Sequence, residues 1–201
     1  MQLSPKATAL VLIDLQKGVL AMPVAPHSGV DVYERSKLVA ERFRAAGALV
    51  VRVRVSFGKD HALAPRQPVD QPTNLAGLPA GWDGFPDHPE ENGDIVVTKR
   101  QWGAFHGTDL DLILRNRGID TVIITGICTN VCCETTAREA NMRDYKVFFI
   151  SDATATFNTP EVSADQIQPV VLATLKAAFA QIENTTSMIR KLEEHRSAFA
   201  A

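Results

Sequence analysis

The sequence predicts an α/β protein with a three-layer, doubly wound architecture, in which a mostly parallel sheet of five or six strands carries helices on both faces. Two observations predict this fold. Short runs of β-branched and apolar residues alternate with longer amphipathic segments along the 201 residues, as strands and helices do in βαβ units. The first run, residues 7–13 (ATALVLI), is apolar throughout, which is typical of a strand buried on both faces of a parallel sheet. The length suits a single domain, residues 1–201, with a full core.

The first half of the chain gives one helix, a second strand and two loops. Residues 31–46 place apolar side chains at helical spacing and stop at Gly47, which indicates an amphipathic helix. Residues 48–55 (ALVVRVRV) alternate in part and predict the second strand. We expect loops at residues 15–27, which hold two prolines, and at 56–93, rich in proline, glycine, aspartate and histidine. A loop as long as the second one is usually functional or a lid.

The second half of the chain shows the same alternation of strand-like and helix-like segments. Residues 94–98, 121–125 and 146–150 are rich in β-branched or aromatic side chains, and each is expected to be a strand. Residues 108–116 begin with a threonine that can cap a helix, and 131–142 have helical composition after the break that we expect at the glycine following the fourth strand.

The C-terminal part is harder to divide. We expect a long helix within residues 161–182, a short last strand at 185–189 and a charged helix at 190–201. Pro169 must then lie in the first turn of the long helix, where the missing N–H of proline breaks no hydrogen bond.

Composition and charge exclude several classes of protein. A net charge of −2, a pI near 6.2 and the absence of basic blocks argue against nucleic-acid partners and anionic membranes. The N-terminal residues show neither a signal-peptide pattern nor the roughly 20 apolar residues of a membrane span. Three cysteines, two of them adjacent, do not suit a disulfide framework. We therefore expect a cytoplasmic protein.

Chemically useful side chains follow three of the expected strands. Asp14 and Lys99 each follow a strand directly, and the cysteines Cys128, Cys132 and Cys133 lie where the fourth strand passes into a helix. A thiol at a helix start faces free N–H groups and the positive end of the helix dipole, which lowers its pKa. Alone, such an aspartate is usually a turn residue, a lysine solvated and a small cysteine part of the core. In a doubly wound sheet, however, the carboxyl ends of strands converge on one crevice.

Two motifs carry a resemblance to a known family. Residues 126–132 read GICTNVC, with a Thr-Ala pair shortly after Glu134, and residues 99–110 match K-R-x-x-x-x-F-x-G-T-D-L. With the aspartate after the first strand, these motifs resemble the isochorismatase-like cysteine hydrolases, which include nicotinamidases, N-carbamoylsarcosine amidohydrolases and ureidoacrylate hydrolases. The resemblance runs from about residue 7 to residue 152. It implies that the whole chain is one isochorismatase-like hydrolase domain.

The resemblance also implies a role for each site residue. Cys132 matches the nucleophile, Asp14 the base that takes the thiol proton, and Lys99 the lysine that holds this aspartate and favours the thiolate. The peptide bond between Ile127 and Cys128 matches one that is cis in the family. The backbone N–H groups of Cys128 and Cys132 would then form an oxyanion hole, in which each donor contributes about 3 kcal/mol.

The substrate pocket is less well defined by the sequence. We expect Trp102, Phe105 and the long loop to line it, and Gln16 either to contact the substrate or to support the loop. Trp102 either stacks on a planar amide or covers the pocket. Arg54 and Arg100 can bind a substrate carboxylate, or they are simply solvated.

One departure from the family pattern concerns a metal site. The nicotinamidase branch carries D-x-H-x-x-x-x-x-H after its second strand, whereas residues 53–61 lack that spacing: Asp60 and His61 are adjacent, and His88 and His106 lie far away. The three cysteines also lack the spacing of a zinc site. We therefore expect no catalytic metal and no cofactor, and we do not expect nicotinamide as the substrate.

The sequence thus predicts a hydrolase that cleaves a C–N bond of a small amide, carbamoyl or ureido substrate through a thioester. The alternatives are a vinyl-ether hydrolase of the isochorismatase type with Asp14 as acid and base, a thiol redox protein, and a binding protein without catalysis.

Cys133 points away from Cys132 on a helix, so we expect it to pack rather than react. The expected partners are a small-molecule substrate and further copies of the chain, as a homodimer or homotetramer, with no nucleic acid or membrane.

Overall fold

The protein is built around one twisted sheet. The structure, a computed structural model, describes residues 3–72 and 77–199. In these residues seven strands pair in the order β2-β6-β5-β1-β3-β4, with β7 added beside β6, and every pair is parallel except β2 with β6. The predicted fold class is confirmed, but the described residues form seven strands instead of the five or six expected, because the short strands β2 and β7 extend the sheet. The strands are β1 (Thr8–Ile13), β2 (Val24–Ala25), β3 (Leu49–Val55), β4 (Ile95–Lys99), β5 (Thr121–Ile127), β6 (Lys146–Phe157) and β7 (Gln181–Glu183).

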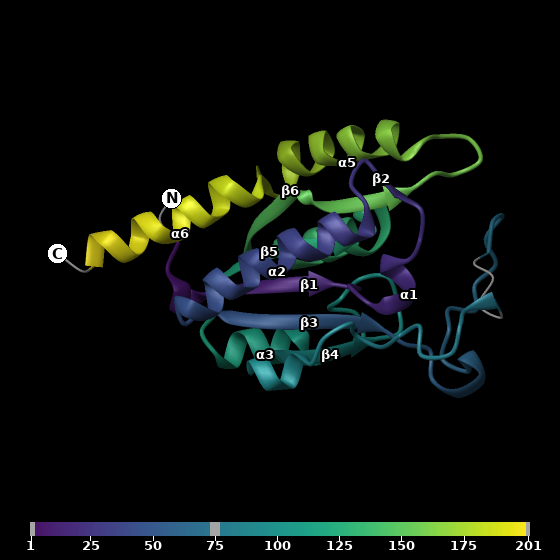
Figure 1. The fold of residues 1–201 in the computed structure, drawn as a ribbon, viewed down its shortest axis with the longest axis horizontal. Coiled ribbons are helices and arrows are strands. Elements are labelled where there is room, and N and C mark those ends of the chain that lie inside the picture. The colour runs from purple at the N-terminus through teal and green to yellow at the C-terminus, as the bar shows by residue number, and fades with distance from the viewer. Residues whose placement is uncertain (1–2, 73–76, 200–201) are drawn as a thin grey trace.

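Helices cover both faces of the sheet (Figure 1). On one face lie α1 (Lys17–Leu20), α2 (Gly29–Ala45) and α6 (Thr185–Phe199). On the other lie α3 (Leu110–Asn116), α4 (Glu134–Asn141) and α5 (Ala164–Ala178). Shorter helical turns occur at η1 (Pro5–Ala7), η2 (Lys59–His61), η4 (Pro89–Asn92) and η5 (Thr129–Cys133), the last a single π-helical turn. No helix of the described residues is long and apolar enough to cross a lipid bilayer.

The central strand β1 shows why the sheet is buried on both sides. Its side chains alternate between the two core clusters: Val11 and Ile13 pack toward α3, α4 and α5, whereas Leu10 and Leu12 pack toward α2 and α6. All four are at most 1% exposed. An uninterrupted apolar run is therefore what this position in the sheet requires.

Two strands extend beyond their predicted ends. β5 continues through Gly126, where we expected a break. A Cβ at this glycine would lie 2.1 Å from the carbonyl oxygen of Ile13, so glycine lets the strand run close beside β1. β6 also continues past residue 150. Its polar residues Ser151 and Asp152 lie where the pairing with β5 is irregular, and regular pairing resumes at Thr154. Polar residues inside a strand look like its end when only the sequence is read.

Three local predictions were wrong. Residues 15–27 are not simply a loop, since they contain α1 and β2. Pro169 lies in the second turn of α5, where one early hydrogen bond of the helix is lost, rather than in the first. The expected strand at 185–189 is the start of α6. Asn184 caps this helix, because its side chain accepts from the N–H of Ser187 at 2.8 Å. The backbone N–H and the hydroxyl of Thr185 also donate to the carboxylate of Asp152, at 2.7 and 2.9 Å, which ties the first turn to β6.

The long loop between β3 and β4 projects from the carboxyl edge of the sheet, opposite the edge where the chain termini lie (Figure 1). Its second half is fixed to the core. The amides of Lys17 and Gly18 donate to the carbonyls of Gly84 and Trp82. The buried guanidinium of Arg52 forms two hydrogen bonds with the carboxylate of Asp87, at 2.7 and 3.0 Å. The loop therefore has an anchored part beside the strand ends and an outer part that extends from them.

Candidate active site

Three side chains from separate strands meet at this edge. Asp14 follows β1, Lys99 is the last residue of β4, and Cys132 lies in η5 directly after β5. The Lys99 ammonium lies 2.8 Å from Oδ2 of Asp14. The thiol of Cys132 interacts with both groups. All three are buried, with exposed fractions of 1% for Asp14, 0% for Lys99 and 8% for Cys132. The structure thus brings together the residues that the sequence placed at strand ends.

The backbone around Asp14 turns its carboxylate into the crevice. Asp14 has a φ of +52°, a left-handed conformation that aspartate adopts more readily than most residues. Its N–H donates to the carbonyl of Val53 on the neighbouring strand. Oδ1 of Asp14 is buried and lacks a hydrogen bond of good geometry among the described residues. This oxygen is the one available to accept a proton.

Burial and charge shift the three pKa values. Burial raises the pKa of Asp14, and the attraction of Lys99 only partly opposes it. Burial alone would lower the pKa of Lys99, but Asp14 and Cys132 outweigh it and raise this pKa above its ordinary value. A hydrogen bond to Cys128, then burial, raise the pKa of Cys132 well above that of a free thiol. The expected lowering of a thiol pKa at this helix start is therefore wrong for Cys132, because its sulfur is buried beside a carboxylate.

The other two cysteines have different surroundings. The peptide bond between Ile127 and Cys128 is cis. The sulfur of Cys128 accepts the hydrogen bond from Cys132 and also faces the backbone N–H groups of Val131 and Cys132, which together lower its pKa. One of the two predicted oxyanion-hole donors, the amide of Cys132, thus faces a sulfur in this structure. Cys133 is fully buried in the core cluster beneath α3, α4 and α5, as expected for a packing residue.

Gln16 supports the loop. Its Nε2 donates to the carbonyls of Val55 and Asp83, at 2.9 and 2.8 Å, and its Oε1 accepts from the N–H of Val55 at 2.9 Å. The side chain is fully buried and both amide hydrogens are used. Of the two roles considered for Gln16, the contacts fit loop support, because they tie the end of β3 to the anchored part of the loop.

Replacing Gln16 by leucine should lower the free energy of unfolding by about 2–4 kcal/mol, because backbone groups of Val55 and Asp83 would be left buried and unpaired. Urea denaturation measures the change. Gln67→Leu, at an exposed position of the same loop, should stay within roughly 0.5 kcal/mol of the original protein. Equal stability of the two variants would show that the three hydrogen bonds of Gln16 contribute nothing net.

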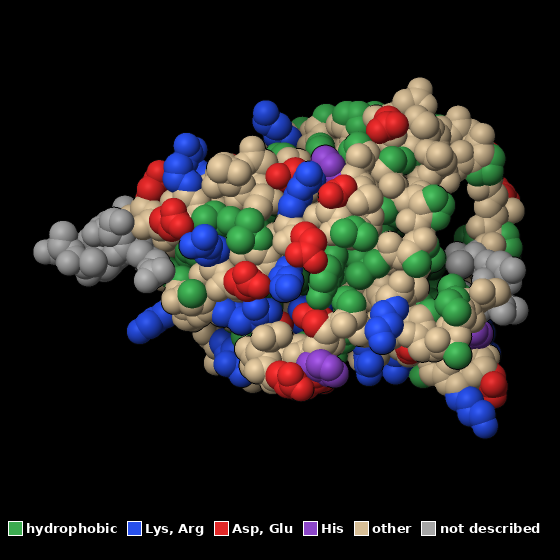
Figure 2. All heavy atoms as spheres, viewed as in Figure 1, with side chains coloured by type: hydrophobic (Ala, Val, Ile, Leu, Met, Phe, Trp, Pro, Cys, Tyr) green, Lys and Arg blue, Asp and Glu red, His purple; other side chains and the backbone are tan. Residues whose placement is uncertain are grey.

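A cavity of about 380 Å³ lies between the outer part of the loop and the strand ends. Figure 2 shows the molecule hollowed at this edge, between the projecting loop and the body. The carbonyl of Gln101 accepts a hydrogen bond from Lys99 at 3.1 Å, so a wall of the cavity touches the buried cluster directly. The cavity is lined by Phe57, Pro65, Arg66, Gln67, Val69, Gln71, Pro72, Gln101 and Trp102.

The two aromatic residues expected in the pocket differ in position. Trp102 lines the cavity and is 42% exposed. Phe105 is 4% exposed and does not line it: its ring packs against Tyr145 with the centroids 5.8 Å apart, within the core cluster. Only two residues lie between these positions, and the chain turns inward between them.

The two arginines that could bind a substrate carboxylate already make hydrogen bonds within the protein. Arg54 donates to the hydroxyl of Thr98, and Arg100 donates to the carbonyl of Ser56. Neither lines the cavity. Arg66, which the sequence did not single out, does. Its only signal in the sequence was its place in a loop of functional length.

A comparison with models of known protein families shows which family this chain belongs to. The model of the isochorismatase domain matches residues 8–187. The chain belongs to the isochorismatase family. It is therefore a hydrolase.

Relatives of this isochorismatase-family protein cover most of its length. It is 45% identical to the isochorismatase family protein YecD of Escherichia coli O157:H7, over 76% of this chain and 82% of that protein. It is 32% identical to the ureidoacrylate amidohydrolase RutB of an Enterobacter species, over 75% of this chain and 76% of that protein. A solved isochorismatase family structure from Burkholderia thailandensis superposes with a TM-score of 0.86 at 38% identity, covering 96% of this chain and 98% of the other.

The side chains that could bind a metal ion are scattered over the described residues. Within residues 3–72 and 77–199, no three histidine, cysteine, aspartate or glutamate side chains are grouped so that they could hold a metal ion. Asp60 and His61 lie in η2 on the outer part of the loop. The chemistry that can be derived from this site is that of its own thiol, carboxylate and ammonium groups.

Proposed function

We propose that this isochorismatase-family hydrolase is a cysteine amidohydrolase, which cleaves a C–N bond of a small amide, carbamoyl or ureido substrate through a thioester. One observation carries the proposal: a buried thiol, carboxylate and ammonium group interact with one another beside an open cavity. The similarity to a protein named as a ureidoacrylate amidohydrolase supports the amide class.

In the first half-reaction, Asp14 accepts the proton of the Cys132 thiol while the sulfur attacks the carbonyl carbon. A resting thiol with a raised pKa needs such a base. The carbonyl oxygen becomes an oxyanion that the N–H groups of Cys128 and Cys132 receive, so the Cys132 amide exchanges its contact with the Cys128 sulfur for the substrate. The C–N bond then breaks, Asp14 returns its proton to the leaving nitrogen, and a thioester on Cys132 remains.

In the second half-reaction, water replaces the amine. Asp14 takes a proton from the water, whose oxygen attacks the thioester carbon, and the same amides stabilise the second oxyanion. The C–S bond breaks, the sulfur recovers its proton from Asp14, and the acid leaves. Lys99 stays protonated throughout and holds the carboxylate in place, which its raised pKa permits.

Intact-protein mass and ammonia release test the proposal directly. The protein is mixed briefly with a panel of small amides, carbamoyl amino acids and ureido acids, and the mass is read before and after turnover. We expect ammonia release with some member of the panel and a transient adduct that a Cys133→Ala variant still forms. Turnover without any adduct in a Cys132→Ala variant would overturn the thioester route and favour acid–base chemistry at Asp14, as in vinyl-ether hydrolysis.

The pH dependence of kcat/KM should report Asp14. The base must be ionised, and burial raises its pKa above the ordinary value of 3.8. The rate should therefore fall as the pH is lowered through a midpoint above 3.8. Asp70→Asn, at an exposed position that does not line the cavity, should leave the midpoint unchanged. A midpoint at or below the ordinary value would contradict the assignment of Asp14 as the base.

A further inference from the structure

The cavity beside the buried cluster has an unbalanced polar lining. Among the described residues, its lining contains one cation, Arg66, and the glutamines Gln67, Gln71 and Gln101, but no aspartate or glutamate. The remaining surface is apolar and includes the rings of Phe57 and Trp102. Such a lining suits a small ligand that combines an anionic group with a hydrogen-bonding one.

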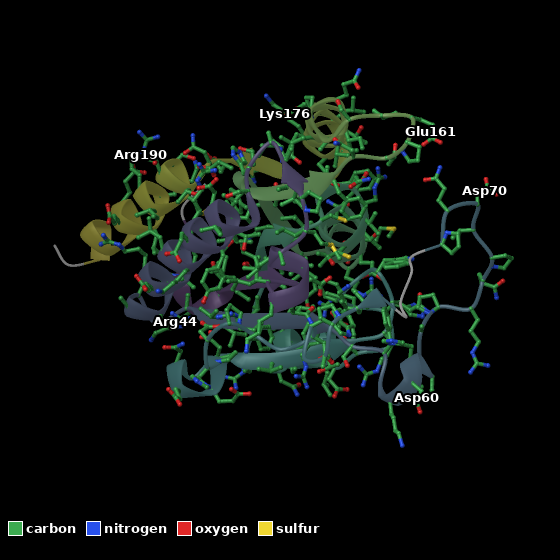
Figure 3. The ribbon with its side chains drawn as sticks, turned by 45° about the vertical axis from the view of Figure 1, so that its right-hand side comes forward. Arg44, Asp60, Asp70, Glu161, Lys176 and Arg190 are labelled. Atoms are coloured by element: carbon green, nitrogen blue, oxygen red, sulfur yellow. The ribbon has the colours of Figure 1, made fainter. Side chains whose placement is uncertain are left out.

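The charge of Arg66 is not neutralised by an ion pair within the described residues. Its guanidinium donates only to the carbonyl of Ala62, at 3.3 Å. The acidic residues nearest to it on the loop, Asp60 and Asp70, do not line the cavity. Figure 3 shows Asp60 in the helical turn shortly after β3 and Asp70 at the outer end of the loop. The guanidinium therefore keeps its paired N–H groups for an anion, and a carboxylate matches their geometry.

One residue of the cavity lining is hydrogen-bonded to the buried cluster. Gln101 lines the wall and binds Lys99 through its carbonyl. On the opposite side, Gln71 donates to the carboxylate of Glu161 at 2.9 Å, which ties the outer loop to the segment before α5. Figure 3 shows this segment approaching the loop near Asp70. A volume of about 380 Å³ holds a molecule of metabolite size.

We propose that Arg66 binds a carboxylate of the substrate, so that this enzyme selects small amides carrying an acid group at the end remote from the scissile bond. The inference rests on the proposed amidohydrolase function and names its substrate class. Arg54 and Arg100 cannot take this role without giving up their contacts with Thr98 and Ser56. Trp102 and Phe57 would cover the linker between the acid group and the amide.

Binding to a protein that cannot turn over separates this proposal from the proposed function. A Cys132→Ala protein is titrated with N-carbamoylglycine and with its neutral counterpart, N-carbamoylglycinamide, by calorimetry and tryptophan fluorescence. We expect the acid to bind roughly tenfold more tightly, as hydrogen bonds to a charged group allow. Adding Arg66→Gln should remove this preference, whereas Lys59→Gln, an exposed cation outside the cavity, should retain it.

The outcomes decide the two proposals separately. Equal binding of the acid and the neutral compound, or no binding of either, overturns the role of Arg66. A preference that survives Arg66→Gln, or that Lys59→Gln abolishes equally, overturns it as well. In the unaltered enzyme, turnover of neutral amides with no preference for acids would leave the amidohydrolase proposal standing and reject the acid class. An Arg66→Gln enzyme should show a KM raised roughly tenfold for acids only.

Discussion

Replacing Cys132 by alanine is expected to lower kcat by roughly 10⁴-fold or more, because it removes the sulfur on which the proposed thioester forms. Cys132→Ser should be almost as inactive, because a serine hydroxyl loses its proton far less readily than a thiol. Steady-state kinetics on the best substrate of the panel measures both variants.

Cys133→Ala is the matched control for the nucleophile. It removes a neighbouring sulfur that is equally buried but packs in the core. Its activity should stay within a few-fold of the original, with a loss of about 1 kcal/mol in the free energy of unfolding from the small cavity left behind. If Cys132→Ala kept its activity while Cys133→Ala lost it, the two thiols would have to exchange roles.

Breaking the ion pair between Asp14 and Lys99 should have the largest effect on stability. Lys99→Met leaves the carboxylate buried without its cation, which costs about 3–5 kcal/mol in pairs of this kind. The pKa of Asp14 should rise further, because only Lys99 offsets its burial to a large extent. A larger share of the carboxylate would then be protonated, and kcat should fall with the loss of the base.

A double variant separates stability from catalysis. Asp14→Asn with Lys99→Met removes both charges, so neither is left buried alone. Urea denaturation should show most of the lost stability recovered, while activity stays absent. If the double variant were no more stable than Lys99→Met, the cost would come from packing around the lysine side chain. If it were active, Asp14 would not be the base.

The parts of the site that could be predicted are those that depend on strand ends. Asp14 and Lys99 each directly follow an apolar run, and the sheet order brings those ends together without further information. The position of Cys132 could be predicted in the same way, because it lies just past the end of another predicted strand. The raised pKa of its thiol could not be predicted, since it depends on the neighbouring side chains of Asp14 and Cys128 rather than on the start of a helix.

Other features depend on contacts between distant segments. Gln16 was ambiguous because its partners, Val55 and Asp83, lie 39 and 67 residues away. The first turn of α6 is held partly by Asp152, 33 residues earlier, although a local cap also exists, in which the N–H of Ser187 donates to the side chain of Asn184. Arg66 gave no signal of its own, because a cavity formed by an irregular loop leaves no periodic pattern in the sequence.

The described residues of the loop between β3 and β4 add no strand to the sheet, yet most of the residues that line the cavity come from this loop. The reacting groups, in contrast, are held by strands and a helical turn at the centre of the fold. Substitutions at the outer positions of the loop can therefore redirect selectivity while the reaction and the sheet remain intact. In such an architecture, the same chemical mechanism can act on new substrates. Engineering of a new specificity should therefore begin with residues 62–72.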